Sequence, residues 1–306
     1  MEKNEPMSIF KRPVSMALFA LTAAVAWGWA YPLIKLGFEY WAITPEMTGA
    51  KMLFAGVRFS VAGLIILAIA AMSGKTMKIA RTSAWIYLLI FALLNTTLHY
   101  TFFYIGMSHS PGARAAILNS SGTFLLVILA CLFFKSDRLS LAKVLGCILG
   151  FGGIAALNTG DGSAQFSFQG DGMIMLNALC AAYAGLMTPG LGRRVDIVVA
   201  TGYSLALGGL LLVIIGVVLG GTLPRISPEG LTVLSLLIAI SALGFSLYNK
   251  LLTCNPVGKV AIYNSLIPIV GALTSCLCLG EPFQLRYLIA ALLAAGGIYI
   301  INRSKS

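Results

Sequence analysis

Residues 281–302 read EPFQLRYLIAALLAAGGIYIIN, and residues 137–158 read DRLSLAKVLGCILGFGGIAALN. In both stretches an acidic residue precedes a run that is almost wholly apolar. A weaker similarity relates residues 28–32 (GWAYP) to residues 185–189 (GLMTP). An offset of 144 residues aligns six identical pairs of the longer stretches without a gap: Leu141 with Leu285, Leu149 with Leu293, Gly152 with Gly296, Gly153 with Gly297, Ile154 with Ile298, and Asn158 with Asn302. The chain therefore contains an internal duplication.

The apolar runs of the chain are long enough to cross a membrane. Of its 306 residues, 58% are hydrophobic and only 10% are charged, whereas soluble proteins carry about 25% charged residues. A helix needs about 20 apolar residues to cross the hydrocarbon core. We therefore expect an all-α membrane protein with ten transmembrane helices, at residues 14–38, 49–72, 84–107, 112–134, 140–158, 170–190, 198–220, 230–252, 257–279 and 285–302.

Basic residues fall mostly on one side of these ten helices. If the N-terminus is cytoplasmic, 15 of the 21 Lys and Arg residues lie on the cytoplasmic side, and the other six are Lys35, Lys51, Arg58, Arg114, Arg225 and Arg286. The positive-inside rule therefore predicts cytoplasmic N- and C-termini and a multi-pass protein of the cell (cytoplasmic) membrane.

The duplication divides the chain into two five-helix repeats, residues 1–158 and residues 159–306. Because five is an odd number, the second repeat enters the membrane from the opposite side, which gives an inverted-topology repeat. In transporters this architecture allows one central site to open alternately to either side of the membrane. A duplication that serves only the structure is the alternative.

Composition also bears on partners and cofactors. The net charge of +11 does not indicate nucleic-acid binding, because the basic residues stand singly or in pairs between apolar runs. We expect these residues to face anionic lipid. Cys276 and Cys278 have no His or Cys at metal-ligand spacing, and the cysteines lie within or near apolar runs. We therefore predict no disulfide framework, no metal site and no cofactor.

Segments in both halves carry family motifs. They are AWGWAYPLIK (26–35), Arg58–Phe59, YIGMSHSPGARAAILNS (104–120), FFKSDRLSLAKVLGCILGFGGI (133–154) and YNKLLTCNPVGKVAIYNSLIPIVGALTSCLCLGEPFQLRYLIAALLAAGGIYI (248–300). In these segments the chain resembles the EamA branch of ten-helix permeases in the drug/metabolite transporter superfamily, and the likeness covers nearly its whole length. The resemblance implies a carrier, most commonly one that exports amino acids or related metabolites.

The chain departs from the family's pattern at two places. Family members usually carry a Pro in both halves where this chain has Pro268 in the second half and Gly122–Thr123 in the first. The fourth helix is followed by Asp137, where a Gly-Glu pair such as Gly280–Glu281 is usual. These departures leave the fold expectation unchanged and weaken any substrate assignment by analogy.

Acidic residues are absent from the depth of the expected helices. Asp171 lies at the start of the sixth helix, and the other nine acids lie in loops or at helix ends. Carriers of lipophilic cations usually need a buried carboxylate, and many proton-coupled carriers use one as a relay. The substrate is therefore expected to be a zwitterion or an anion.

Basic and aromatic side chains do enter the helices. Trp27, Tyr31 and Lys35 follow one another at intervals of four residues, so that they form one stripe on the first helix. Four basic side chains either extend to the membrane interface or form a positive vestibule for a carboxylate or phosphate: Lys35, Lys51, Arg58 and Arg114. The stripe either belongs to an aromatic belt or contacts substrate.

Uncharged polar residues complete the candidate substrate-binding set. His99 is the ionisable residue nearest to mid-span, one turn after Asn95. It either relays protons or makes a structural hydrogen bond between helices. Four further residues have two possible roles, because each either holds helices together by a hydrogen bond or contacts the ligand. They are Asn119, Tyr183, Tyr248 and Asn264.

We therefore expect a secondary transporter that moves a small polar or amphipathic metabolite by alternating access, most simply an exporter of an amino acid or a related zwitterion or anion. Its partners are expected to be that small molecule and the lipid bilayer, with the chain a monomer or homodimer. A membrane-embedded enzyme or a non-transporting scaffold is the alternative. An enzyme would need clustered catalytic groups, but His99 and His109 differ in depth by about 15 Å.

Overall fold

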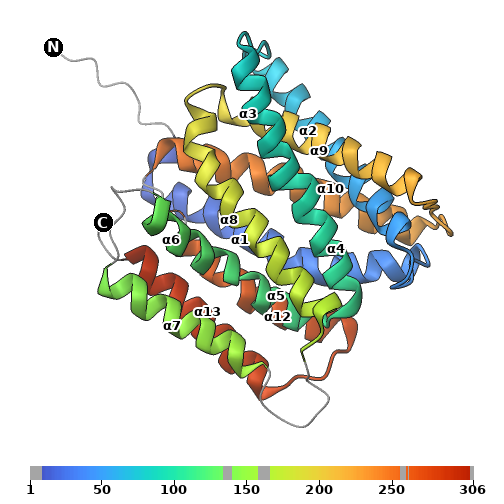
Figure 1. Ribbon diagram of the computed structural model, residues 1–306, viewed down its shortest axis with the longest axis vertical. Coiled ribbons are helices and arrows are strands. Elements are labelled where there is room, and N and C mark those ends of the chain that lie inside the picture. Colours follow the sequence, from blue (N-terminus) through green and yellow to red (C-terminus); the bar gives the residue numbers. More distant parts are fainter. Residues whose placement is uncertain (1–8, 134–139, 158–165, 256–259, 261, 304–306) are drawn as a thin grey trace.

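The computed structural model describes residues 9–133, 140–157, 166–255, 260 and 262–303, and over these ranges the chain is helical and contains no strand. The helices run alongside one another as a bundle (Figure 1). The elements of the first half are η1 (Ile9–Lys11), α1 (Pro13–Tyr40), α2 (Thr48–Met72), α3 (Thr82–Ala92), η2 (Leu93–Leu98), α4 (His99–His109), α5 (Gly112–Asn119), α6 (Ser121–Phe133) and α7 (Leu141–Ala156). Those of the second half are η4 (Phe168–Gly172), α8 (Met173–Gly192), α9 (Ile197–Val218), α10 (Pro228–Cys254), η5 (Ile262–Ser265), α12 (Leu266–Leu279) and α13 (Leu285–Arg303).

Within the described residues, seven helical segments are long and apolar enough to cross a membrane. They are Pro13–Tyr40, Thr48–Met72, Thr82–His109, Gly112–Phe133, Phe168–Gly192, Ile197–Val218 and Pro228–Leu251. Three shorter apolar helices are Leu141–Ala156, Tyr263–Leu279 and Leu285–Ile301. The prediction of an all-helical membrane protein is confirmed, and each expected span overlaps one of these ten segments. The count of ten crossings stays a prediction.

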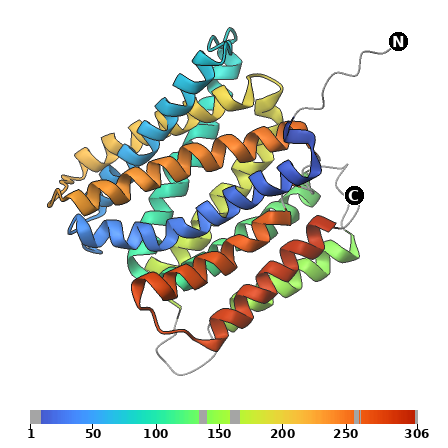
Figure 2. The ribbon, with the colours of Figure 1, turned by 180° about the vertical axis from the view of Figure 1, so that it is seen from behind.

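The start of α1 and the end of α13 lie at the same end of the bundle, as the front and back views agree (Figures 1 and 2). The turns from α2 to α3 and from α8 to α9 lie toward that end too. Such an arrangement fits an even number of crossings. Asp137 and Asn158 of the repeated stretch, and the expected boundary between the repeats, fall outside the described residues.

Helices α2 and α9, the second helix of each half, pack through glycines that recur every seven residues. A Cβ added at Gly49, Gly56 or Gly63 of α2 would lie 3.0, 2.8 or 2.7 Å from the carbonyl oxygen of Gly216, Gly209 or Gly202 of α9, respectively. Only glycine permits an approach this close, as in small-residue interfaces of membrane helices. The two halves are therefore joined backbone to backbone along this seam.

Candidate functional site

A cavity of about 210 Å³ lies between helices of both halves. Its described walls come from α1, α4, α5, α6, α8, η5, α12 and α13. Four of the candidate substrate-binding residues predicted from the sequence line it, namely Tyr31, His99, Asn119 and Asn264. The described residues that line it are Tyr31, His99, Ala116, Asn119, Ser120, Gly122, Thr123, Leu126, Ala181, Asn264, Ile267, Pro268 and Ile298.

Two side-chain amides, one from each half of the chain, line the cavity and are hydrogen-bonded to other side chains. Asn119 donates from Nδ2 to the hydroxyl of Tyr31 at 2.8 Å, and its Oδ1 accepts from Nδ2 of Asn177. Asn264 donates from Nδ2 to the hydroxyl of Tyr248, also at 2.8 Å. Each amide is therefore held by a phenol, so that its orientation is fixed before any ligand arrives.

The two asparagines occupy equivalent positions of the two repeats. Residues 116–120 read AILNS and residues 261–265 read AIYNS, with an offset of 145. The next residue is a serine in both cases, and Ser120 and Ser265 have the same backbone angles, φ −61° and ψ −18°. Helix α5 ends at Asn119 before α6 begins, and η5 gives way to α12 at Ser265. Both serines keep helical backbone angles within the helical segments Gly112–Phe133 and Tyr263–Leu279, so that each helix is distorted rather than broken at matching positions of the two halves.

Among the residues that the structure describes, no Lys, Arg, Asp or Glu side chain lines this cavity. Its polar groups are amides, hydroxyls and one imidazole, and the remaining wall is apolar or glycine. A site of this composition recognises a ligand by hydrogen bonds and shape. A ligand with a net charge would find no compensating ion in the lining described here.

Trp27 lies one contact beyond the cavity. Its ring packs edge-on against Tyr248 and Phe245 of α10, with centroids 5.1 and 5.5 Å apart. Because Tyr248 accepts the Asn264 hydrogen bond, Trp27 supports the amide rather than lining the cavity. Of the predicted stripe, Tyr31 therefore lines the cavity and Trp27 lies just behind its wall, whereas Lys35 is not part of it.

His99 reaches the cavity from the point where a π-helical turn, η2, passes into α4. Its ring packs against Tyr100 and Phe103, and its buried Nδ1 has no hydrogen-bond partner among the described residues. Wide π-helical turns inside α-helices are frequent at functional sites. His99 is the one side chain of the lining that ordinarily titrates near neutral pH.

Asn95 lies apart from His99, although the two were expected to share a helix face. Its Nδ2 donates to Ser204 Oγ at 3.4 Å, and nearby Thr97 donates to the carbonyl of Gly208 at 3.1 Å. The small residues of α9 allow the π-helical turn to approach closely. This approach turns Asn95 toward α9 and away from the cavity.

The basic candidates also lie outside the cavity. Arg58 is 3% exposed and donates to Ser241 Oγ at 2.9 Å and to the hydroxyl of Tyr104 at 3.0 Å. Lys35 is half-buried and has no hydrogen-bond or ion-pair partner among the described residues. Arg58 is therefore held between α2, α4 and α10, and neither residue contributes charge to the cavity wall.

Tyr183 is 39% exposed on the outside of α8. Its neighbour Ala181 lines the cavity instead. Residues two positions apart on a helix point in different directions. The placement of Tyr183 suits an aromatic side chain facing lipid.

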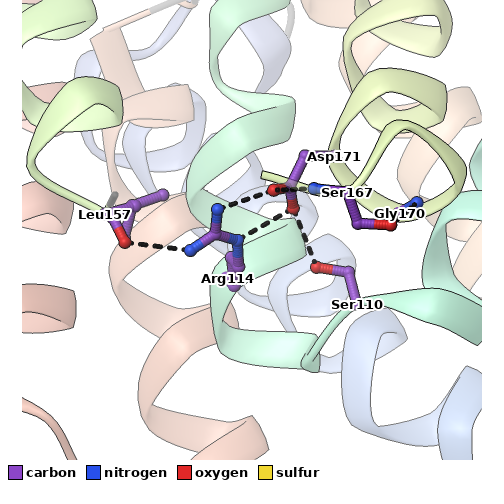
Figure 3. A network of polar contacts seen from close by, with 6 residues as sticks. All are labelled: Ser110, Arg114, Leu157, Ser167, Gly170 and Asp171. Carbon is purple, nitrogen blue, oxygen red and sulfur yellow. Dashed lines mark hydrogen bonds and ion pairs between the residues drawn. The ribbon is translucent and has the colours of Figure 1, made fainter. Parts of the chain in front are cut away.

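A buried ion pair, which was not expected from the sequence, lies beside the cavity-lining part of α5 (Figure 3). Arg114 binds Asp171 through two parallel hydrogen bonds, Nε to Oδ1 at 2.8 Å and an Nη to Oδ2 at 2.6 Å. Arg114 also donates to the carbonyl of Leu157 at 2.9 Å, while Ser110 Oγ and the Ser167 N–H donate to Asp171. Both charges are buried, with 6% and 2% of their side chains exposed. The pair ties α5 to the end of α7 and to η4.

Glu281 closes the same end of α5 from the second half. Its two carboxylate oxygens accept from the backbone N–H of Gly112 at 2.7 Å and of Ala113 at 3.1 Å. A carboxylate at a helix N-terminus satisfies free donors and complements the helix dipole. Glu281, the acid that opens the second repeated stretch, is therefore a cap that joins the two halves.

The fold and the cavity define a class: a helical membrane protein built for transport. The EamA-like transporter family matches the chain twice, over residues 14–159 and 168–303. The chain belongs to this family.

Relatives agree with this assignment. The uncharacterized transporter YvbV of Bacillus subtilis (strain 168) is 27% identical over 297 residues, 95% of this chain and 92% of that protein. The uncharacterized inner membrane transporter YedA of Escherichia coli (strain K12) is 26% identical over 251 residues, 79% of this chain and 72% of that protein. A crystal structure of 18% identity superposes with a TM-score of 0.69, covering 94% of this chain and 96% of its own, and shows the same fold.

Proposed function

We propose that this membrane transporter is a carrier that moves a small polar or amphipathic metabolite by alternating access, and that the cavity between Asn119 and Asn264 is its substrate site. The observation that carries the proposal is the pair of asparagines at equivalent helix distortions, each of which presents an amide to one cavity. Inverted repeats can rock about a fixed central site. The two matches of the family model support the division into repeats at residues 1–158 and 159–306.

The lining favours a substrate without net charge, such as an amino acid or a related zwitterion. Amides both donate and accept hydrogen bonds, so two of them suit an ammonium and a carboxylate carried by one molecule. Of the two substrate classes expected from the sequence, the zwitterion fits this lining better than the anion. Export across the cytoplasmic membrane is the direction that we propose.

Reconstituted liposomes test this proposal. Purified protein is supplied with pooled amino acids and related metabolites, with and without a pH gradient. We expect saturable flux of at least one zwitterion and weaker flux of its decarboxylated amine or its N-acetylated acid, each of which carries net charge. Saturable flux of anions or cations only, or of nothing in the pool, would contradict the assignment.

His99 gives a separate test of coupling. If His99 relays protons, His99→Gln removes accumulation driven by a pH gradient and keeps substrate exchange between the two sides, because exchange needs no net proton movement. The pH profile of uptake is the measurement. An unchanged profile in the variant assigns His99 to packing or substrate contact and removes it as a relay.

A further inference from the structure

A second, larger pocket of about 460 Å³ lies at one end of the bundle, away from the cavity residues. The ends of four helices meet there: α2 ends at Met72, α3 begins at Thr82, α8 ends at Gly192, and α9 begins at Ile197. All four belong to segments that can cross a membrane. The pocket therefore lies where these segments leave the hydrocarbon core.

Positive charge dominates the pocket. Its lining includes the cations Lys75, Lys78, Arg81 and Arg194 against one carboxylate, Asp196, which gives a formal charge of +3. Lys75 forms an ion pair with Asp196. Lys78 and Arg81 are exposed and have no partner in the part of the chain that the structure describes. Two cations are therefore free to bind an anion.

The loop that carries these cations is held in a defined conformation. Tyr203 donates from its hydroxyl to the carbonyl of Met77 at 3.3 Å, and Trp85 donates from Nε1 to the carbonyl of Ile79 at 3.2 Å. The rings of Trp85 and Tyr203 pack edge-on at 5.3 Å. The two carbonyls on either side of Lys78 are thus fixed, and the pocket exists before a ligand binds.

Arg194 is fixed from the opposite wall. Its guanidinium lies over the ring of Tyr87 at 4.4 Å and donates to the carbonyl of Gly190 at 2.6 Å. Helix α3 begins at the pocket without a side-chain cap, so that its first N–H groups add partial positive charge. Arginine, lysine and a helix N-terminus together favour a phosphate over other small anions.

An apolar face runs away from the pocket along α3. Ile86, Leu89 and Ile90 of α3 are 56%, 48% and 49% exposed, and Leu93, the first residue of η2, is 41% exposed. Their spacing places all four on one side of the helical segment. At the end of α2, Met72 is 80% exposed. In a membrane this face contacts acyl chains. A molecule bound at both places needs an anionic head and hydrocarbon tails.

We propose that this pocket binds the phosphate of an anionic phospholipid, with Lys78 and Arg81 contacting the headgroup and its acyl chains lying along α3. Basic pockets between membrane helices bind such headgroups through the same charges that attract basic segments to anionic membranes. This site is separate from the substrate cavity. Its occupant tethers the turns from α2 to α3 and from α8 to α9 to the membrane surface.

The test measures the thermal unfolding midpoint of the purified full chain in detergent as phosphatidylglycerol is added. A ligand that binds the folded state raises the midpoint in a saturable way. The variant is Lys78→Gln with Arg81→Gln. The matched control is Lys11→Gln with Arg12→Gln, which removes the same charge from exposed residues beside α1. Phosphatidylcholine and glycerol phosphate are the comparison ligands.

The expected result is a saturable rise of the unfolding midpoint with phosphatidylglycerol. The apparent affinity read from this rise should be about 30-fold weaker in the variant Lys78→Gln with Arg81→Gln and unchanged in the control. The conservative variant Lys78→Arg with Arg81→Lys should retain binding, which separates lost charge from lost folding. Equal phosphatidylglycerol binding by the wild type and the glutamine variant would overturn the proposal. Glycerol phosphate that raises the midpoint as strongly as the lipid would overturn the lipid as the source of the phosphate.

Discussion

The cavity and the start of α5 are adjacent, yet they use polarity in opposite ways. The polar groups of the cavity are amides, hydroxyls and an imidazole, and its wall has no charged side chain within the described ranges. At the start of α5, by contrast, three charged side chains are bonded to protein: Arg114 and Asp171 to each other, and Glu281 to two backbone N–H groups. Charge at the start of α5 joins helices to one another, whereas the polar groups of the cavity are neutral.

This difference has a physical basis. A buried ion is costly unless it is paired and hydrogen-bonded, so buried charges in this protein are held by several partners. A neutral amide costs less to expose to a cavity and exchanges hydrogen bonds readily with a ligand. Mutations at the start of α5 are therefore expected to change mainly the stability of the protein, and mutations in the cavity mainly its transport.

The largest effect is expected at the buried ion pair. Arg114→Leu leaves Asp171 charged and buried without its main partner, which should lower the free energy of unfolding by about 3–5 kcal/mol. Thermal unfolding in detergent and the yield of monodisperse protein are the measurements. The double variant Arg114→Leu with Asp171→Leu should recover much of the loss, because no charge is left unpaired. A single variant as stable as the wild type would show that the pair holds nothing in place.

A smaller loss is expected at the cap of α5. Glu281→Gln keeps one carbonyl acceptor but removes the charge, so that stability should fall by about 1 kcal/mol. Glu229→Gln, at the exposed first turn of α10, is the matched control. An unfolding midpoint that drops equally in both variants would argue against a specific cap by Glu281.

The smallest effect is expected at the ion pair of Lys75 with Asp196. Partial burial would raise the pKa of Asp196, but Lys75 and the N–H groups of Val199 and Val198 outweigh it and hold the pKa below its ordinary value. The folded-state pKa is depressed, so this stabilisation is present at neutral pH and is lost as the pH falls below about 4. Asp196→Asn should cost about 1 kcal/mol or less at pH 7. Its unfolding midpoint should converge on that of the wild type in acid, and a constant difference would contradict the assignment.

Much of the fold was predictable because membrane spans depend on the length of apolar runs, which is a local property. The sequence also singled out Tyr31, His99, Asn119 and Asn264, since polar side chains within apolar helices are few. The direction in which a side chain points is harder to predict from the sequence, because it depends on which helix packs against it.

Asn95 and Arg114 illustrate that limit. Asn95 faces α9 because a π-helical turn docks on Ser204 and Gly208, and no periodicity in the sequence indicates that turn. Arg114 was interpreted as either reaching the interface or lining a vestibule, whereas it pairs with Asp171, which is 57 residues away in the chain. Such a pairing becomes visible only once α5 and η4 are brought together.

We propose above that Asn119 and Asn264, at equivalent positions of the two halves, form one substrate site. The most direct measurement is the affinity of the purified protein for the zwitterion identified in liposomes, with Asn119→Leu and Asn264→Leu made separately. Asn249→Leu is the matched control, because Asn249 is an amide on α10 that donates to Thr201 at 2.6 Å and does not line the cavity. We predict affinity about tenfold weaker in both cavity variants and unchanged in the control. Unaltered affinity in both folded cavity variants would place the substrate site elsewhere in the bundle.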